Sequence, residues 1–195
     1  MAMELPAANS AGTADTRARE RFDALYRQHY SRVLAYALRR AAPDVAHDVV
    51  ADTFLVAWRR LDKVPTDPLP WLLAVARKTL ATHRRSARRR GALGVELEAQ
   101  AAAESRFADA DTSEPTDAIS AAVGQLPERD QELLKLVVWD GLSTAEAAAV
   151  IGVSHVAARV RLHRIKRRLA AELEADAEVH QSRYTGRLGT REEAR

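Results

Sequence analysis

Hydrophobic residues recur every three or four positions along most of the chain, which is the spacing of amphipathic α-helices. In the first half, this pattern predicts helices at about 16–40, 44–61 and 71–90. The first two are separated by Ala42-Pro43, and the last two by a loop over 62–70 that three prolines stiffen. Further helices are expected from about residue 118 onward, so the pattern predicts an all-α protein.

Capping signals divide the stretch from Leu126 to Leu169 into three helices. Proline and early carboxylates suit the first turn of a helix, glycine suits its end, and a serine followed by glutamate three residues later forms a capping box. In chain order the signals are Pro127 with Glu128 and Asp130, then Gly141, then Ser143 with Glu146, then Gly152, then Ser154. A small helix, a glycine turn and a basic helix together predict a helix-turn-helix.

The last of these helices is strongly basic, with no acidic residue from Arg159 to Arg168. In a helix-turn-helix the second helix enters the major groove, and its first residues face base edges. These would be Ser154, His155 and Ala157, while Arg159, Arg161 and Arg164 would meet phosphates or guanine. The alternative is an ordinary helical hairpin with a solvated basic face.

Asp44, Asp48 and Asp52 lie four residues apart and form one acidic stripe on the second helix. A stripe of this kind suits either a basic partner surface or simple exposure to solvent, and the sequence favours neither. A metal site is less favoured, because a single helical row cannot surround an ion and only His47 lies nearby.

The third helix carries a cationic flank, which can neutralise phosphates and release counterions. Its members are Arg77, Lys78, His83, Arg84, Arg85, Arg88, Arg89 and Arg90. Trp71 at the start of this helix could stack on an exposed base, although one tryptophan is more often part of a core. His29, on the apolar face of the first helix, is interpreted as a packed, hydrogen-bonded histidine rather than a ligand.

Composition and charge limit the kinds of partner and the cellular location to be expected. Apolar residues make up 47% of the chain and charged residues 29%, and a net charge of only +3 hides separate basic and acidic clusters. This segregation suits a polyanionic partner together with a second partner of another kind. There is no cysteine, no long apolar span and no signal core, so a soluble cytoplasmic protein without membrane insertion is expected.

No phosphate-binding glycine loop, nucleophile elbow or paired His-carboxylate motif is present. The sequence therefore supports neither an enzyme nor a cofactor. The predicted organisation is a disordered N-terminus (1–16), a helical domain (17–90), an acidic linker (91–115), a helix-turn-helix domain (116–175) and a mobile tail (176–195).

Two stretches of the chain resemble bacterial sigma factors. Residues 22–90, with HDVVADTFLVAWRRL and WLLAVARKTLATHRRSARRR, resemble the promoter-melting domain. Residues 117–170, with LPERDQELLKLVVWDGLSTAEAAAVIGVS, resemble the C-terminal domain. Two such domains on a short linker are similar to the extracytoplasmic-function sigma factors, and the resemblance covers about two-thirds of the chain. It implies a three- to four-helix bundle and a helix-turn-helix domain joined by a flexible acidic linker.

The resemblance also implies partners. Such factors bind core RNA polymerase and promoter DNA, and many are held inactive by an anti-sigma protein. The surface for the polymerase β′ clamp coiled coil would comprise Asp44, Asp48, Asp52, Phe54 and Trp58. The loop 62–70 would hold a flipped base of the minus-ten element, and Arg77, Lys78, His83, Arg84, Arg85 and Arg88 would lie on the helix that meets the upstream edge of that element. The helix from Ser154 to Arg164 would enter the minus-thirty-five groove.

The chain departs from the family pattern at several of these positions. Lys78 stands where asparagine is usual, Ala157-Ala158 where Thr-Val is usual, and Val160 where a small polar residue is usual. The promoter sequence therefore cannot be carried over from the family.

Two other functions compete with this one. A stand-alone helix-turn-helix regulator would explain residues 117–170 but would leave the aspartate stripe and the basic third helix without a purpose. A metal-dependent nuclease would use Asp44, Asp48 and Asp52.

Overall fold

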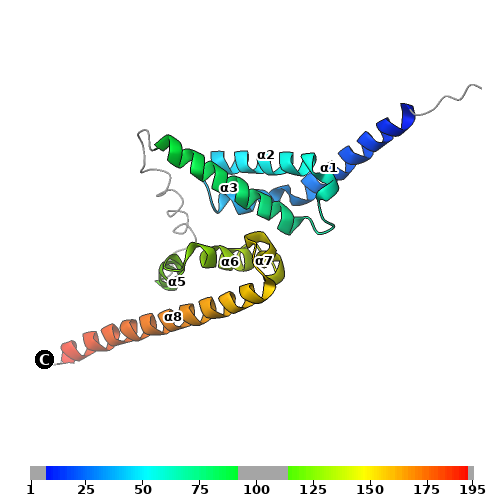
Figure 1. Ribbon diagram of the computed structural model, residues 1–195. Helices are drawn as coiled ribbons and strands as arrows, with labels where there is room; N and C mark the ends of the chain where they lie inside the picture. Colours follow the sequence, from blue (N-terminus) through cyan, green and yellow to red (C-terminus); the bar gives the residue numbers. More distant parts are fainter. Residues whose placement is uncertain (1–7, 92–113, 193–195) are drawn as a thin grey trace, which may run out of the picture. The chain divides into compact units, whose positions relative to one another are not determined.

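Every regular element in the described part of the chain is a helix, so the all-α prediction is confirmed. The computed structural model describes residues 8–91 and 114–192. The chain divides into two units, Met1–Ala103 and Glu104–Arg195 (Figure 1). Most of the predicted acidic linker, along with residues 1–7 and 193–195, lies outside the described residues.

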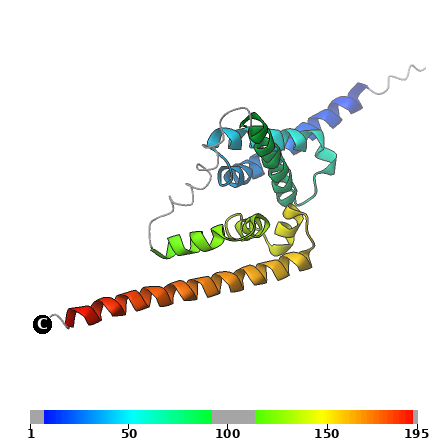
Figure 2. The same ribbon diagram turned by 60° about the vertical axis from the view of Figure 1, so that its left-hand side comes forward.

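The first unit is a bundle of three helices that all contact one another: α1 (Ala8–Leu38), α2 (Pro43–Arg59) and α3 (Leu69–Gly91). The bundle closes because each helix has one apolar face, and these faces meet in a core that excludes water. Val33 and Tyr36 of α1, Val49 of α2 and Leu72 of α3 are all completely buried. The N-terminal part of α1 continues beyond the other two helices (Figures 1 and 2).

The second unit contains α5 (Glu114–Gly124), α6 (Glu128–Val138), α7 (Thr144–Ile151) and α8 (His155–Glu192). Both α6 and α7 contact α8, and α5 packs on it as well. The core is built from Leu133 and Leu136 of α6, Ala147 of α7, and Ala158 and Ile165 of α8, none of which is more than 2% exposed. The C-terminal part of α8 runs past the other helices of this unit (Figure 2).

Two helix ends differ from the sequence prediction. Residues 8–16 were expected to be disordered but belong to α1, and residues 176–192 were expected to be a mobile tail but belong to α8. Both segments adjoin a strongly formed helix, and adding a residue to an existing helix is far easier than nucleating one. Ion pairs four residues apart support both helices near these ends, Arg19–Asp15 at 2.7 Å and Arg168–Glu172 at 2.8 Å.

The start of α3 is a third difference. Pro70 was placed in the loop, but it occupies the first turn of the helix, where a missing N–H costs nothing. The main-chain N–H of Leu72 donates to the carbonyl of Pro68 over 2.9 Å, so the helical bonding begins at once.

His29 is packed inside the first unit, as predicted, with 7% of its surface exposed. The predicted hydrogen bond is not found: neither ring nitrogen has a partner among the described residues. Burial lowers the pKa of His29, the nearby charge of Arg32 lowers it further, and Asp67 acts in the opposite direction. The fold therefore disfavours protonation of this histidine.

We expect this histidine to make the first unit less stable in mild acid. The unfolded chain binds a proton near pH 6.5, whereas the folded chain resists it, so stability is lost as the pH falls below that value and the loss levels off below the folded pKa. Urea unfolding from about pH 7.5 to about pH 5.5 should reveal this slope, and His29→Leu should flatten it. Because the leucine also removes two unsatisfied nitrogens, we expect it to raise the free energy of unfolding at neutral pH by about 1 kcal/mol.

Candidate functional site

The acidic stripe predicted on α2 lies on the surface. Asp44, Asp48 and Asp52 are all exposed on one face of the helix. The same face continues with Leu55 and Trp58, which are 44% and 40% exposed. The surface therefore combines carboxylates at one end with apolar side chains at the other, a pairing that suits a basic, amphipathic partner better than bulk water. We call these five residues the α2 face.

One carboxylate of the α2 face also contacts α3. Oδ2 of Asp52 lies 3.1 Å from Nε2 of His83, and both side chains remain partly exposed. The sequence assigned Asp52 to a protein interface and His83 to a nucleic-acid interface. The structure places them side by side, so the acidic surface borders directly on the basic one.

Phe54, assigned to the same interface as Asp52, is not on the surface. It is only 3% exposed and packs against Phe22, Tyr26 and Tyr30 of α1, with ring centroids 6.4, 4.7 and 6.5 Å away. A direct contact between Phe54 and a partner is therefore excluded in this fold, which corrects the sequence assignment. Its role is to fix Phe22, whose ring lies 5.2 Å from the exposed Trp58.

The cationic flank of α3 divides into anchored and projecting side chains. Arg84 donates from Nη2 to the carbonyl of Arg40 over 3.0 Å and so ties α3 to the end of α1. Arg85 donates to Oγ1 of Thr82 over 3.1 Å. Lys78 and Arg88 are exposed, whereas Arg77 is half-buried. The cationic flank predicted from sequence is present in the structure. Arg84 and Arg85 form hydrogen bonds within the protein, whereas Lys78 and Arg88 project into solvent.

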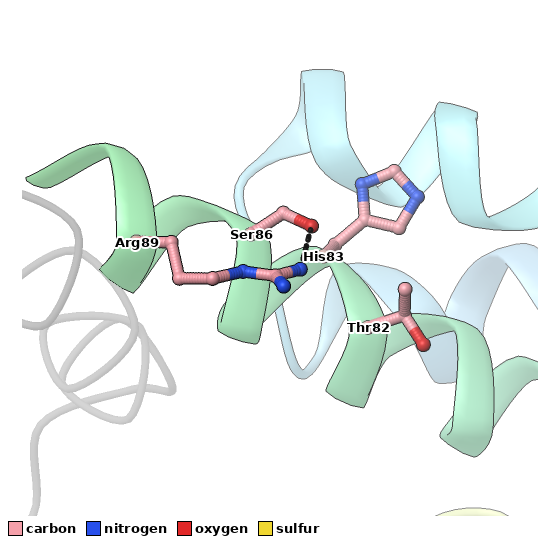
Figure 3. Close-up of a pocket in the computed structure, with 4 residues that line it drawn as sticks. All are labelled: Thr82, His83, Ser86 and Arg89. Atoms are coloured by element: carbon pink, nitrogen blue, oxygen red, sulfur yellow. Dashed lines mark hydrogen bonds between the residues drawn. The ribbon is translucent and has the colours of Figure 1, made fainter.

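A shallow hollow on α3 lies along this flank (Figure 3). It is lined by Thr82, His83, Ser86 and Arg89, and Arg89 donates to Oγ of Ser86 over 3.4 Å. A lining of hydroxyl, imidazole and guanidinium groups offers hydrogen-bond donors to an oxyanion such as a phosphate. The side chain of Arg90, the last member of the predicted flank, lies outside the described residues.

The loop between α2 and α3 has a fixed base and an exposed tip. It begins with a short 3₁₀ helix, Leu61–Lys63. Val64 and Leu69 are buried at its two ends, and Arg21 of α1 donates to the carbonyl of Val64 over 3.1 Å. Residues 65–67 between these anchors are exposed, so the tip can meet a partner without disturbing the bundle.

The helix-turn-helix is formed as the capping signals predict. The hydroxyl of Ser143 accepts from the N–H of Glu146 over 3.3 Å, and a carboxylate oxygen of Glu146 accepts from the N–H of Ser143 over 2.6 Å. Gly152 ends α7 with φ of +73°, a conformation that strongly favours glycine. The hydroxyl of Ser154 then accepts from the N–H of Ala157 over 3.2 Å and caps α8.

The outward face of α8 differs from the one predicted. Ser154, His155, Arg159 and Arg164 are exposed, as a groove-binding helix requires. Ala157 is half-buried, and Arg161 turns towards α6, where Nη1 lies 3.1 Å from Oδ1 of Asp130. Arg161 is therefore engaged by α6 while its side chain stays 39% exposed, and the DNA-binding assignments of Ala157 and Arg161 remain predictions.

Sequence reasoning missed four residues on this face. A shallow hollow on α8 is lined by Val156, Arg159, Val160, His163, Arg164 and Arg167. Val156 is 71% exposed and Val160 is 45% exposed, although neither was assigned to the DNA-binding surface from sequence. The signal was available: Ala158, Leu162 and Ile165 mark the buried side, and the missed residues lie opposite to it.

In the parts of the chain that the structure describes, no group of three His, Cys, Asp or Glu side chains could hold a metal ion. Among the same residues, no helix is long and apolar enough to cross a membrane.

Two known protein families match the two units. Residues 25–90 match the family described as Sigma-70 region 2, and residues 116–169 match the family described as Sigma-70, region 4. The first match spans the end of α1, α2 and α3, and the second spans α5 to the basic part of α8.

Curated relatives are similar to the chain over most of its length. The chain is 30% identical to the ECF RNA polymerase sigma factor SigL of Mycobacterium tuberculosis over 155 residues, which are 77% of this chain and 88% of SigL. It is 33% identical to the ECF RNA polymerase sigma factor BldN of Streptomyces coelicolor over 181 residues, which are 90% of this chain and 67% of BldN.

Solved structures show the same fold. CnrH, solved in complex with the cytosolic domain of CnrY, is 26% identical and superposes with a TM-score of 0.52, over 80% of this chain and 88% of CnrH. The sigma factor RpoE from Bartonella quintana, solved with the anti-sigma factor NepR, is 23% identical with a TM-score of 0.57, over 80% of this chain and 98% of RpoE.

Proposed function

The chain belongs to the extracytoplasmic-function sigma factors of RNA polymerase, and we propose that its two units divide the work of promoter recognition. The first unit joins core polymerase to the minus-ten element, and the second reads the minus-thirty-five element. The observation that carries this proposal is the combination, in one chain, of a capped helix-turn-helix with a basic outer face and a separate bundle whose acidic and basic surfaces adjoin. A stand-alone regulator would need only the first of these.

Core polymerase docks on the α2 face. Carboxylates at Asp44, Asp48 and Asp52 complement a basic partner, and Leu55 and Trp58 supply the desolvated apolar contact that usually holds most of the binding energy. The partner surface proposed here is the clamp coiled coil of the β′ subunit. Phe54 contributes from within, by holding the aromatic cluster that supports Trp58.

The minus-ten element meets α3 and the loop that precedes it. Melting DNA gives up about 1–2 kcal/mol of stacking per base-pair step, so the separated strand must be held by other contacts. Lys78, Arg85 and Arg88 neutralise phosphates at the upstream edge, and Arg77, His83 and Arg84 complete the basic surface. The exposed tip at residues 65–67 receives a base that leaves the stack.

The minus-thirty-five element meets α8. Ser154 and His155 begin the helix, Arg159 and Arg164 project from it, and Arg161 fixes its angle through Asp130. Joining two DNA-binding units in one chain makes the second contact intramolecular, so two modest sites on one promoter together bind tightly.

An anti-sigma protein is the third proposed partner. CnrH was solved with the cytosolic domain of CnrY, and it shares this fold. The α2 face exposes apolar side chains beside carboxylates, and a bound inhibitor would remove both from polymerase.

Transcription in vitro tests the proposal directly. Core polymerase is combined with the purified full-length chain on a genomic promoter library, and the start sites are sequenced. We expect initiation at a small set of templates that share two elements, none of which core polymerase uses alone. Unchanged start sites on every template would disprove a sigma function, and tight protection of a palindrome without polymerase would favour a stand-alone regulator.

Replacing the exposed tip of the loop should change the choice of minus-ten sequence. We expect Thr66→Ala with Asp67→Ala to alter the preference at one base by up to about tenfold, which is the size of one good base contact. The buried anchors Val64 and Leu69 remain, so the melting temperature and the minus-thirty-five preference should stay the same. Start-site selection from a library randomised at minus ten measures the effect. An unaltered preference would move the base-holding role to another segment.

A further inference from the structure

The N-terminal half of α8 carries an apolar pair on its outer face. Val156 is the most exposed large hydrophobic residue in the described part of the chain, at 71%, and Val160 is 45% exposed. They lie four residues apart and therefore side by side on the helix. The buried side of the same turns is formed by Ala158 and Leu162, so the two valines take no part in the core of the unit.

Exposed valines are unfavourable at these positions. A β-branched side chain lowers helix propensity relative to alanine, and its apolar surface gains nothing while it faces water. The residues around Val156 and Val160 indicate what kind of partner could bury them. The hollow that contains both valines is otherwise lined by Arg159, His163, Arg164 and Arg167, with no carboxylate among them.

A cationic rim around an apolar spot complements the major groove of duplex DNA. Phosphates run along both edges of that groove, and the C5-methyl groups of thymines are the apolar features of its floor. In a helix-turn-helix the second helix, here α8, is the one that enters a major groove, which favours duplex DNA over an acidic protein surface as the partner. The rigid valine side chains also lose little freedom when they are covered.

We propose that Val156 and Val160 read thymine C5-methyl groups in the upstream promoter element, while Arg159, Arg164 and Arg167 hold the neighbouring phosphates. This inference rests on the proposed function and adds to it the chemical feature that selects the base. Four residues of helix advance about 6 Å, which matches up to about two base-pair steps of 3.4 Å. The two methyl groups should therefore lie within two steps of each other.

Deoxyuridine substitution tests the proposal, because deoxyuridine pairs as thymidine does and lacks only the methyl group. The full-length chain with core polymerase first selects a duplex from a library randomised upstream. Each thymidine of the selected element is then replaced singly by deoxyuridine, and equilibrium binding is measured. We expect a loss of about three- to fourfold at one or two neighbouring positions, the factor that burying one methyl group supplies.

Alanine variants connect the effect to the two side chains. Val156→Ala and Val160→Ala should bind the thymidine and deoxyuridine duplexes equally at the position that each one reads. Both side chains are exposed and alanine favours helices, so the variants should fold normally. Val138→Ala is the matched control, because Val138 is also exposed, at 61%, but lies on α6; it should retain the full discrimination.

The outcomes separate this inference from the function that it deepens. Equal binding of every deoxyuridine duplex by the wild type would overturn methyl reading while leaving promoter recognition intact. Discrimination that persists in both valine variants would assign it to other residues and would also overturn the proposal. A loss of polymerase binding in these variants, with DNA discrimination unchanged, would show that the valines face a protein. Failure to select any duplex would remove the proposed function together with this inference.

Discussion

Core polymerase will bind the chain far more weakly when Asp48 and Asp52 are both replaced with arginine. The two carboxylates lie exposed in the middle of the α2 face, and reversal turns attraction to a basic partner into repulsion. Like charges forced together across an interface cost several kcal/mol, so the expected loss of affinity is on the order of a thousandfold. Co-purification with core polymerase, followed by titration of the binding, measures it.

Matched controls distinguish this loss from a general effect of charge. Glu20 and Asp23 of α1 are also exposed, and Glu20→Arg with Asp23→Arg makes the same change in net charge at another place. We expect that variant to bind normally. His83→Ala tests the Asp52–His83 pair separately; because the pair is exposed, little stability depends on it, and polymerase binding should be retained. A doubly reversed variant that folds and still binds would remove docking from the α2 face.

The helix-turn-helix could be predicted from sequence because its signals act over very short distances. The Ser143–Glu146 box and the Ser154 cap each span three residues, and Gly152 acts through its own backbone. Side-chain chemistry at such positions determines the conformation without help from the rest of the fold. All of these predictions are confirmed.

The outward face of α8 depends on residues far away in the sequence. Whether Arg161 points to solvent or to the protein is decided by Asp130, which lies 31 positions earlier on another helix. Composition alone makes every arginine of α8 an equal candidate for DNA. Only the packing of α8 on α6 shows that Arg161 is engaged and that Val156 and Val160 are exposed.

The helix ends were missed for the opposite reason. Local composition around residues 8–16 and 176–192 is polar and lacks a clear apolar stripe, which is typical of disorder. A helix that is already anchored in a core continues into such a segment until a strong stop signal, and neither segment contains proline. The sequence therefore predicted where the helices of each domain lie better than where α1 starts and α8 ends.

On α2, too, packing against another helix decides which of two neighbouring aromatic residues is exposed. Phe54 and Trp58 lie four residues apart, so helical periodicity places them on one side of α2. Three aromatic rings of α1 pack against the buried Phe54, whereas Trp58 remains at the surface. In the proposed docking, Phe54 therefore supports the α2 face and Trp58 forms part of it, and this difference predicts separable effects of mutation.

Replacing Phe54 with alanine should damage the fold, whereas replacing Trp58 should damage binding. Removing a buried phenylalanine costs about 3–5 kcal/mol through lost contacts and the cavity left behind, a large part of the stability of a small domain. Trp58 is 40% exposed, so its removal should cost less than about half of that. An aromatic side chain that becomes buried in an interface can contribute about 2 kcal/mol or more, so Trp58→Ala should weaken polymerase binding by about thirtyfold.

Urea unfolding and polymerase titration, made on the same variants, distinguish the two roles. Phe54→Leu keeps an apolar side chain in the same space, so it should lose about 1 kcal/mol of stability and retain native affinity. If folded Phe54→Leu lost affinity as strongly as Trp58→Ala, Phe54 would have to reach the partner, and the buried cluster would have to open on binding. If Trp58→Ala bound normally, the apolar end of the α2 face would not be a contact. Docking would then rest on the aspartates alone, and affinity would fall steeply with added salt.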